Sequence, residues 1–131
     1  MSLSPEQVEA YLDRIALPQG VRDSLREGGN GSGALKAVTT LQQYHMAAIP
    51  YENLDLHYSS HHSVTLEPKS MYESIVIRKK GGLCLQVHQL FSKLLQSLGF
   101  QTYITAARFN AAASIAADPR LDKSKVAYGP W

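Results

Sequence analysis

One stretch of sequence decides how the fold of this chain is interpreted: Arg78-Lys79-Lys80-Gly81-Gly82-Leu83-Cys84-Leu85-Gln86-Val87-His88-Gln89-Leu90-Phe91. After the cysteine, apolar residues recur at positions 87, 90, 91, 94, 95 and 98, the spacing of one helical face. Gly99 can then adopt a positive φ, and Phe100 can fold back on the last turn. The pattern predicts a helix that begins at Cys84 and ends before Gly99.

Two interpretations of Cys84 follow from this position. In the first turn of a helix, unpaired N–H groups and the helix dipole favour a thiolate, and Lys79 and Lys80 add positive charge nearby. These are conditions that suit a nucleophile. Cys84 also precedes Val87 by three residues and Phe91 by seven, so it shares their apolar face and could be a buried core cysteine. Periodicity leaves both interpretations open.

Two further helices are predicted before this stretch. The first has Ser4 as N-cap, Pro5 in the first turn and Gln7 at the capping-box position, and Pro18 and Gly20 end it. Its apolar face is Val8, Tyr11, Leu12 and Ile15. A glycine-rich loop over 27–33 leads to a second helix over 34–48, closed by Pro50. One side of that helix carries Leu35, Val38, Leu41, Tyr44 or His45, and Ala48.

The remaining segments are predicted from weaker patterns. In residues 51–68, apolar and polar side chains alternate around Leu54 and Leu56 and again around Val64 and Leu66. This pattern indicates a loop with a small hairpin. Residues 70–78 form a helical turn or two, with Met71, Ile75 and Arg78 facing inward. Residues 101–109 are rich in β-formers and predict a strand, and residues 111–127 have the composition of a solvated loop. This gives a helical domain over 1–99, followed by a strand and loop over 100–131.

Composition restricts the class of protein. The 131 residues are 44% hydrophobic and 18% charged, which is typical of a soluble globular chain, and a net charge of +2 is too small to indicate a nucleic-acid partner. The sequence has one cysteine, no secretory leader and no apolar run of ~20 residues, so we expect a cytoplasmic protein with no membrane span. The histidines His57, His61 and His62 suggest a surface turn more than a zinc site, and no bound metal is expected.

Two blocks resemble the arylamine N-acetyltransferase family. Lys80-Gly81-Gly82-Leu83-Cys84-Leu85-Gln86-Val87-His88 resembles that family's Arg-Gly-Gly-aromatic-Cys signature, which continues with Glu or Gln two residues on and usually Asn at the fourth. Ile49-Pro50-Tyr51-Glu52-Asn53-Leu54 is similar to its Pro-Phe-Glu-Asn-Leu element, and Tyr11-Leu12-Asp13-Arg14-Ile15 resembles the Tyr-x-x-Arg-Ile of its first helix. The resemblance extends over residues 5–110.

The resemblance implies a fold and a site. The expected class is α+β: an N-terminal helical bundle followed by the start of a β-barrel, in the papain-like architecture with a cysteine at a helix start. Cys84 would be the nucleophile of a Cys-His-Asp triad. Tyr51, Lys80, Gln86 and Phe100 would line the substrate site or support it, and Arg14 would support packing.

The sequence departs from the family pattern at several positions. Lys80 stands for arginine and loses the planar fork that binds bidentately, Leu83 stands for the aromatic, and His88 stands for asparagine. No histidine follows His88, and the ending Tyr128-Gly129-Pro130-Trp131 resembles the stretch that precedes the catalytic histidine in fungal-looking members. We therefore expect a truncated, N-terminal portion. His88, four residues after Cys84, is a possible substitute base.

The function implied by the resemblance is ping-pong transfer of an acetyl group from acetyl-CoA, or malonyl from malonyl-CoA, through acyl-Cys84 to an arylamine or hydrazine. No permanently bound cofactor is expected. Without the later triad members, these 131 residues should have little activity. The alternatives are a catalytically dead module that self-associates through its unpaired strand, and a papain-like thiol hydrolase or transglutaminase-type enzyme.

Overall fold

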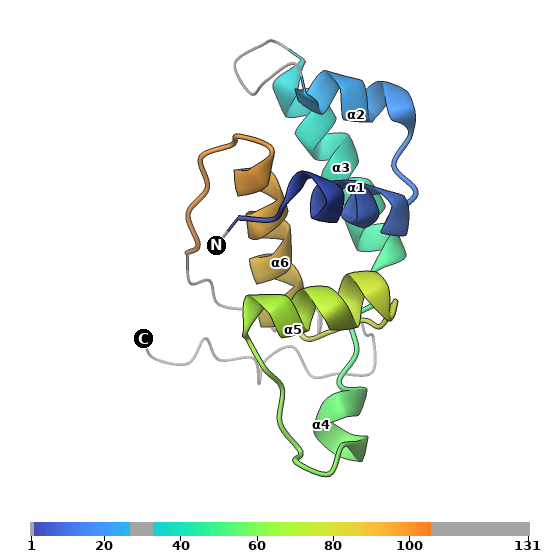
Figure 1. Ribbon diagram of the computed structural model, residues 1–131, viewed down its shortest axis with the longest axis vertical. Coiled ribbons are helices and arrows are strands. Elements are labelled where there is room, and N and C mark those ends of the chain that lie inside the picture. The colour runs from blue at the N-terminus through green and yellow to red at the C-terminus, as the bar shows by residue number, and fades with distance from the viewer. Residues whose placement is uncertain (1, 27–32, 106–131) are drawn as a thin grey trace, which may run out of the picture.

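Helix α1 (Pro5–Arg14) begins as its sequence predicted. The Ser4 hydroxyl accepts from the Gln7 N–H at 3.3 Å, and the Gln7 side chain accepts from the Ser4 N–H at 2.9 Å, which completes a capping box. Val8, Tyr11 and Leu12 are buried on its inner face. The computed structural model describes residues 2–26 and 33–105, and Figure 1 shows the arrangement of their helices.

A helix that the sequence analysis did not predict, α2 (Gln19–Arg26), follows α1 directly. Pro18 directly precedes this helix. Its carbonyl accepts hydrogen bonds from the N–H groups of Val21 and Arg22. Gly20 lies inside α2. Proline is tolerated at the start of a helix because the N–H that it lacks would have no intrahelical partner there. The first helix ends before Pro18, as predicted, but the sequence analysis did not predict that a further helix begins directly after this proline.

Helix α3 (Ala34–Ala48) has the predicted bounds and buries most of the predicted face, with Val38, Tyr44 and Ala48 partly buried against the core. Ala37, Leu41 and His45 are its buried residues, whereas Leu35, which was assigned to the inner side, is exposed. The Ile49 N–H donates to the His45 carbonyl and ends the helix just before Pro50. Helix α2 packs against α3.

The predicted hairpin within residues 51–68 is a short helix instead, α4 (Leu54–Tyr58). Glu52 Oε2 accepts from the Leu54 N–H at 2.9 Å and satisfies a donor at its start. Helix α5 (Pro68–Tyr72) begins with Glu67, whose carboxylate accepts from the Lys69 and Ser70 N–H groups, and continues into the π-helix η1 (Glu73–Ile77). Met71 and Ile75 face the core as predicted, whereas Arg78 is exposed.

Helix α6 (Cys84–Ser97) begins and ends where the sequence predicted. Gly99 has φ +89°, the Phe100 N–H donates to the Leu95 carbonyl and the Gly99 N–H donates to the Gln96 carbonyl. These two bonds are the Schellman pattern, which requires the positive φ at Gly99. The buried residues of α6 are Leu90 and Leu94, well beyond its first turn.

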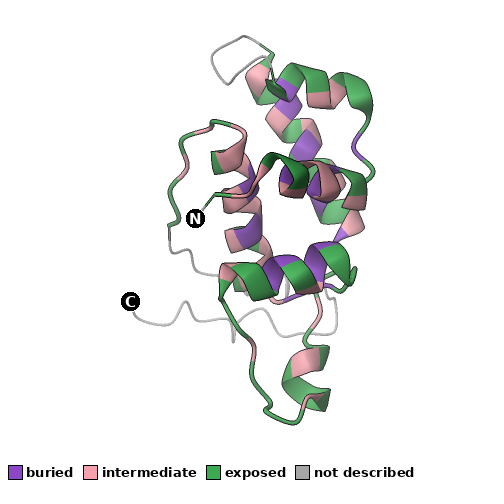
Figure 2. Cartoon of the chain, in the orientation of Figure 1, coloured by how far each residue is buried: buried purple, intermediate pink, exposed green. Residues whose placement is uncertain are grey.

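The core lies where α1, α3, η1 and α6 meet, and Figure 2 shows buried positions on the facing sides of these helices. Helix α1 contacts both η1 and α6, and α5 contacts α6. Side chains that are almost fully buried gather there: Tyr11, Leu12, Ile15, Leu25, Leu41, Met71, Ile75, Leu90 and Leu94. In Figure 1, α4 projects away from this core at the end of the loop that also carries residues 59–67.

The expected α+β class with the start of a β-barrel is wrong for the described part of the chain. Residues 101–105 form no strand; instead, the Thr102 hydroxyl lies 3.0 Å from the Ser92 hydroxyl and 3.0 Å from Gln96 Nε2. The segment thus contacts α6 and not a neighbouring strand, because β-formers make a strand only where a partner strand is present. The predicted positions 106–109 and 111–127 lie outside the described residues. The division into 1–99 and 100–131 stays a prediction.

Candidate functional site

A single β-bridge joins the two blocks of sequence that carried the family resemblance. Tyr51 and Gly82 pair in parallel: the Glu52 N–H donates to the Gly82 carbonyl at 3.1 Å, and the Gly82 N–H donates to the Pro50 carbonyl at 3.2 Å. Among the described residues this is the one β-pairing. It places the end of α3 beside the start of α6.

Gly81 makes this approach possible. A Cβ on Gly81 would overlap the Pro50 carbonyl oxygen and lie 2.6 Å from Glu52 Cγ. Any other residue would therefore push the two segments apart. Backbone packing between the two blocks thus requires glycine at position 81, which is a physical reason for the first glycine of the Gly-Gly sequence before the cysteine helix.

Cys84 is exposed at the first position of α6. The interpretation as a buried core cysteine is thereby excluded, even though Cys84 shares the helical face of Val87 and Phe91. The core packs against α6 at Leu90 and Leu94 and leaves the first turn uncovered. The first N–H groups of a helix have no intrahelical acceptor, so donors of α6 remain available beside the thiol.

Gln86 fixes the start of this helix. Its Oε1 accepts from the Leu83 N–H at 3.0 Å, and its Nε2 donates to the Thr65 carbonyl at 3.0 Å. The side chain thus satisfies one backbone group at the N-cap and holds the loop before α5 against α6. Gln86 acts on the site through backbone and does not line either of the hollows that Cys84 lines.

Cys84 lies at two hollows, which we name by position. The inner hollow, about 240 Å³, lies between α3 and α6 and is lined by His45, Met46, Tyr51, Cys84, His88 and Phe91, among others. The outer hollow, about 740 Å³, lies between α6 and residues 101–105. Cys84, His88 and Phe91 line both. A reagent bound in either hollow would therefore lie beside the thiol.

His45 is a functional candidate that the sequence analysis did not identify. It is 4% exposed, its Nδ1 lies 2.8 Å from the Tyr11 hydroxyl, and its ring centroid lies 4.5 Å from that of Phe91. The pKa of His45 is lowered to about 4, mainly by burial and to a lesser extent by the nearby His88. The sequence analysis placed either Tyr44 or His45 on the inner side of this helix. A histidine at such an apolar position was the feature that could have identified His45.

The other predicted site residues lie at different distances from Cys84 and its two hollows, and only one of those described next lines either hollow. Tyr51 is 69% exposed and lines the inner hollow, which suits a substrate contact. Lys80 Nζ lies 2.9 Å from Asp55 Oδ1 and so tethers α4 to the glycine turn, without lining either hollow. Phe100 is half-buried against the core and ends α6, so it supports the helix and does not line the hollows.

Arg14 holds the turn that leads into the glycines. Its Nε donates to the Ile75 carbonyl at 3.2 Å, and its Nη2 donates to the Lys79 carbonyl at 3.4 Å. Lys79 has φ +57°, a conformation that few non-glycine residues adopt. Arg14 thus connects α1 to the end of η1 and to this turn, which is more specific than the packing role implied by the resemblance.

The Nδ1 of His88 cannot accept the proton of the Cys84 thiol. That nitrogen lies 2.6 Å from the Cys84 carbonyl oxygen, and because a carbonyl only accepts, Nδ1 carries the proton. Only the other ring nitrogen, Nε2, is left to act as a base. His88 is exposed and lines both hollows. Its role as a substitute base stays a prediction.

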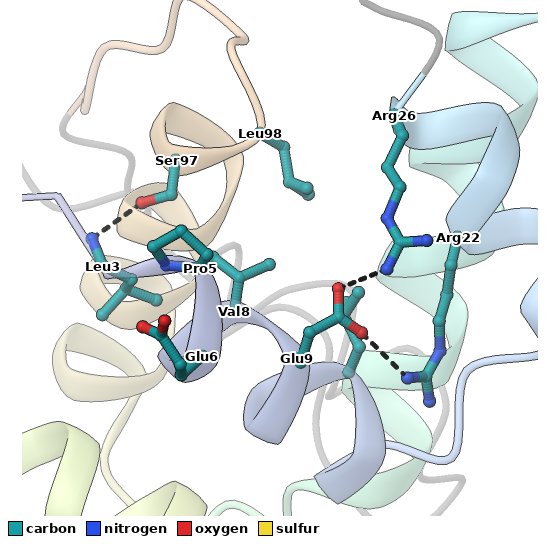
Figure 3. A pocket seen from close by; sticks show the side chains of 10 residues that line it. Leu3, Pro5, Glu6, Val8, Glu9, Arg22, Arg26, Ser97 and Leu98 are labelled. Carbon is teal, nitrogen blue, oxygen red and sulfur yellow. Dashed lines mark hydrogen bonds and ion pairs between the residues drawn. The ribbon is translucent and has the colours of Figure 1, made fainter.

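Another hollow lies at the far side of α1. It measures about 480 Å³, and Figure 3 shows its side chains, which come from α1, α2, the end of α6 and the N-terminal segment. Glu9 lies 2.6 Å from Arg26 and 3.4 Å from Arg22, and Arg22 also lies 2.7 Å from Asp13. These four charges pair with one another, and the remaining carboxylate of the hollow, that of Glu6, accepts a 2.7 Å hydrogen bond from the Ser4 hydroxyl.

Residues 2–26 and 33–105 contain no cluster of three or more His, Cys, Asp or Glu side chains that could hold a metal ion. In the same ranges, no helix has both the length and the apolar character needed to cross a membrane. The histidines of the segment after α4 make local contacts: His61 Nδ1 lies 3.0 Å from the Ser60 hydroxyl, and His62 Nδ1 lies 3.1 Å from the Leu56 carbonyl oxygen.

Comparison with known proteins gives the family. Residues 34–121 match the family model described as N-acetyltransferase. The chain is 33% identical over 136 residues to the N-malonyltransferase FDB2 of Fusarium pseudograminearum (strain CS3096), an alignment that covers 98% of this chain and 38% of the relative. It is 38% identical over 95 residues to arylamine N-acetyltransferase 2 of Mus musculus, covering 72% of this chain and 29% of the relative.

The chain thus spans 38% of the length of the fungal relative and 29% of that of the mouse relative. The family match covers the bridge between the two blocks, the glycine turn, Cys84 and the whole of α6. The chain therefore belongs to the arylamine N-acetyltransferase family.

Proposed function

We propose that Cys84 is the nucleophile of an acyl-CoA-dependent N-acyltransferase whose acceptor is an arylamine or a hydrazine. The observation that carries this proposal is the position of the thiol, which is exposed, lies in the first turn of α6 and lines two hollows. A thiol that served only to fill the core would not be placed there. The names of the related proteins support the reaction class, N-acyl transfer.

The reaction balances in two steps. In the first, the Cys84 thiolate attacks the thioester carbonyl of acyl-CoA, a new S–C bond forms, and the C–S bond to CoA breaks with release of CoA as a thiolate that takes up a proton. In the second, the amine nitrogen attacks the acyl-cysteine, the N–C bond forms, the S–C bond to Cys84 breaks, and the amine loses a proton. This order gives ping-pong kinetics.

Each step passes through an oxyanion that needs hydrogen-bond donors. The first N–H groups of α6, which include that of Cys84 itself, are unpaired within the helix and lie at the positive end of its dipole. Such preorganised donors stabilise developing negative charge most effectively where water is excluded. We propose that the Cys84 N–H is one donor.

The surrounding residues fit this proposal in different ways. Tyr51 forms an exposed wall of the inner hollow and is placed to contact a flat aromatic amine. Gln86, Lys80 and Phe100 hold the start of α6, the glycine turn and the end of α6, respectively. No permanently bound cofactor is part of the proposal, and a reducing cytoplasmic setting would keep Cys84 free.

We expect little turnover from the 131 residues by themselves. The family resemblance assigns the general base to a histidine after the cysteine, and no histidine follows His88 in the sequence. Members of a catalytic triad act as a unit, so the missing base removes most of the rate. Acylation of Cys84, which needs only the thiolate and oxyanion donors, should survive at a slow rate.

The test separates these steps. The purified chain is incubated with acetyl-CoA and, separately, with malonyl-CoA, and the mass of the intact protein is followed over time. We expect one acyl adduct, on Cys84, that is absent from Cys84→Ser and unchanged in the surface control His61→Asn. An adduct elsewhere, or none with either donor, would contradict the proposal.

A second arm distinguishes transfer from hydrolysis. Aminosalicylate is added to the acylated chain, and both the N-acyl product and the free acid are measured. Faster loss of the adduct with amine present supports a transferase. Equal loss with and without amine supports a thiol hydrolase instead.

A further inference from the structure

Another hollow is lined almost entirely by polar side chains. We name it the polar hollow: it measures about 440 Å³, and its lining residues come from α4 and the segment after it, from α5 and η1, from the glycine turn, and from the first turn of α6. Figure 1 shows the segment that runs from α4 back to α5. Val64 is the one apolar residue of this lining. Cys84 does not line the polar hollow, which therefore lies outside the proposed reaction site.

Arg78 brings unused hydrogen-bond donors to the polar hollow. Its Nε lies 3.5 Å from Glu73 Oε1, and neither Nη has a hydrogen-bond partner among the described residues. The two side chains are 65% and 50% exposed, so water screens this ion pair, and it holds the guanidinium only weakly. The planar fork of Arg78 therefore remains available for an oxyanion, which arginine binds bidentately.

The charges of the lining leave an excess of positive charge. Arg78 and Lys80 are its permanent cations, and Asp55 is its one carboxylate. Lys80 Nζ lies 2.9 Å from Asp55 Oδ1, but an ammonium group has three N–H donors, and this contact uses one of them. A bound anion would balance the excess charge. A bound cation would increase it, because the carboxylate is already paired with Lys80.

Hydroxyl groups add neutral donors to the same lining. Ser59 Oγ is fully buried and has no hydrogen-bond partner among the described residues, which is costly for a hydroxyl group. Thr65 Oγ1 accepts from the Glu67 N–H at 3.0 Å and still has its own proton to donate. Gln86, in contrast, uses both ends of its amide on backbone groups. A ligand rich in acceptor oxygens would satisfy the hydroxyls that remain.

We propose that the polar hollow binds an oxyanion of the phosphate class, with Arg78, Lys80 and the hydroxyls of Ser59 and Thr65 as donors. A phosphate group accepts hydrogen bonds on several oxygens at once, which matches a guanidinium fork, an ammonium group and hydroxyls around one space. Inorganic phosphate, a small phosphate ester and the phosphate groups of CoA share this chemistry. The inference is independent of the proposed function, because Cys84 takes no part in it.

The first test is a titration of the ¹⁵N-labelled chain with potassium phosphate, with potassium chloride adjusted to keep the ionic strength constant. Amide resonances are followed by NMR. We expect saturable shifts at residues 59–65, at Arg78 and at the Gln86 side chain, all of which belong to the polar hollow or its segment. Shifts that do not saturate, or that potassium chloride alone reproduces, would show general ionic effects and overturn the inference.

A pair of variants removes a positive charge inside or outside the hollow. Arg78→Gln should weaken phosphate binding about tenfold, because charge-assisted hydrogen bonds are lost. Its matched control is Lys36→Gln, an exposed position on α3 that does not line the hollow and loses the same charge. Equal weakening in both variants would mean that only net charge matters, and the site would be refuted.

A second pair gives an effect of the opposite sign. Asp55→Asn removes the one carboxylate of the lining and frees Lys80, so phosphate should bind more tightly. Asp23→Asn, on α2, changes the net charge equally without lining the hollow and should have little effect. If Asp55 served only to tether α4, its replacement would not improve binding. Unchanged or weaker binding in Asp55→Asn therefore counts against the proposal.

A final arm distinguishes the sources of the phosphate group. The labelled chain is titrated with CoA and with pantetheine, which lacks the phosphates. If CoA shifts the same resonances, Arg78→Gln weakens that effect and pantetheine has none, the site is supported and the phosphates of CoA are one source. If inorganic phosphate shifts them and CoA does not, the result supports a site for a separate small phosphate. No shift with either phosphate compound rules the site out.

Discussion

The Gly82 N–H donates a 3.2 Å hydrogen bond to the carbonyl of Pro50, although the whole of α4, α5 and η1 lies between these two residues in the sequence. This bond and its partner from Glu52 to the Gly82 carbonyl fix the distance between the end of α3 and the start of α6. The inner hollow lies between those same two helices. Its width therefore depends on a backbone contact that only glycine at position 81 permits.

Gly81→Ala should destabilise the fold. The new Cβ would overlap the Pro50 carbonyl oxygen, so the bridge must open or shift, at a cost of about 1–3 kcal/mol in the free energy of unfolding. The matched control is Gly20→Ala, inside α2, where nothing lies within 4 Å of the added Cβ. That variant should gain about 0.5–1 kcal/mol. Urea unfolding measures both, and equal effects would contradict the role assigned to Gly81.

Gln86 should contribute more to the free energy of unfolding than an ordinary surface glutamine. Gln86→Ala leaves the Leu83 N–H and the Thr65 carbonyl without their partners, which should cost about 1–2 kcal/mol of unfolding free energy. Gln86→Glu keeps the acceptor for Leu83 but cannot donate to Thr65, so its loss should be intermediate. Thermal unfolding and amide exchange at Leu83 provide the measurement. Unchanged exchange in Gln86→Ala would argue against the assigned bond.

Acid should weaken the fold through His45. Its pKa is about 4 in the folded chain against an ordinary value of 6.5, so the unfolded chain takes up the proton first as the pH falls. This contribution to stability is present in full above pH 6.5, declines below it and is lost by about pH 4, in total about 3 kcal/mol. Burial is the main cause.

The measurement is the unfolding free energy between pH 7 and 4 in the unaltered chain and in His45→Gln. The glutamine variant starts lower but should show a flatter pH dependence over this range, because carboxylates titrate alike in both proteins. Parallel pH curves would show that His45 is not the group responsible.

Lys80→Ala should have a small effect on stability. The Lys80 side chain is 44% exposed and its partner Asp55 is 47% exposed, and such ion pairs contribute under about 1 kcal/mol. Added salt should remove what difference exists. A loss well above 1 kcal/mol in urea unfolding would indicate that Lys80 does more than tether α4.

Local signals in the sequence predicted the helix ends well. Ser4 with Gln7, and Gly99 with Phe100, act through bonds to residues a few positions away, so neighbouring sequence is sufficient to identify them. Pro18 was misleading, because proline both ends helices and precedes new ones. The strand predicted from residue 101 failed for a different reason: strand formation depends on a partner that local sequence does not supply.

The site was only partly predictable. The blocks around Pro50 and Cys84 could be recognised, but their pairing through Gly82 depends on three-dimensional packing. Periodicity could not decide whether Cys84 is buried, since that depends on where the other helices cover α6. His45 was ambiguous because its role comes from contacts with Tyr11 and Phe91, which lie on two other helices.

Cys84 also makes the chain convenient for spectroscopy. It is the one cysteine in the sequence and it is exposed, so a maleimide fluorophore or a nitroxide would attach at a single known atom. Such a label would sit at the mouth of both hollows, where its emission or its mobility reports the local polarity. Arrival of an amine or of a second polypeptide at this face could then be followed in real time without engineering any other residue.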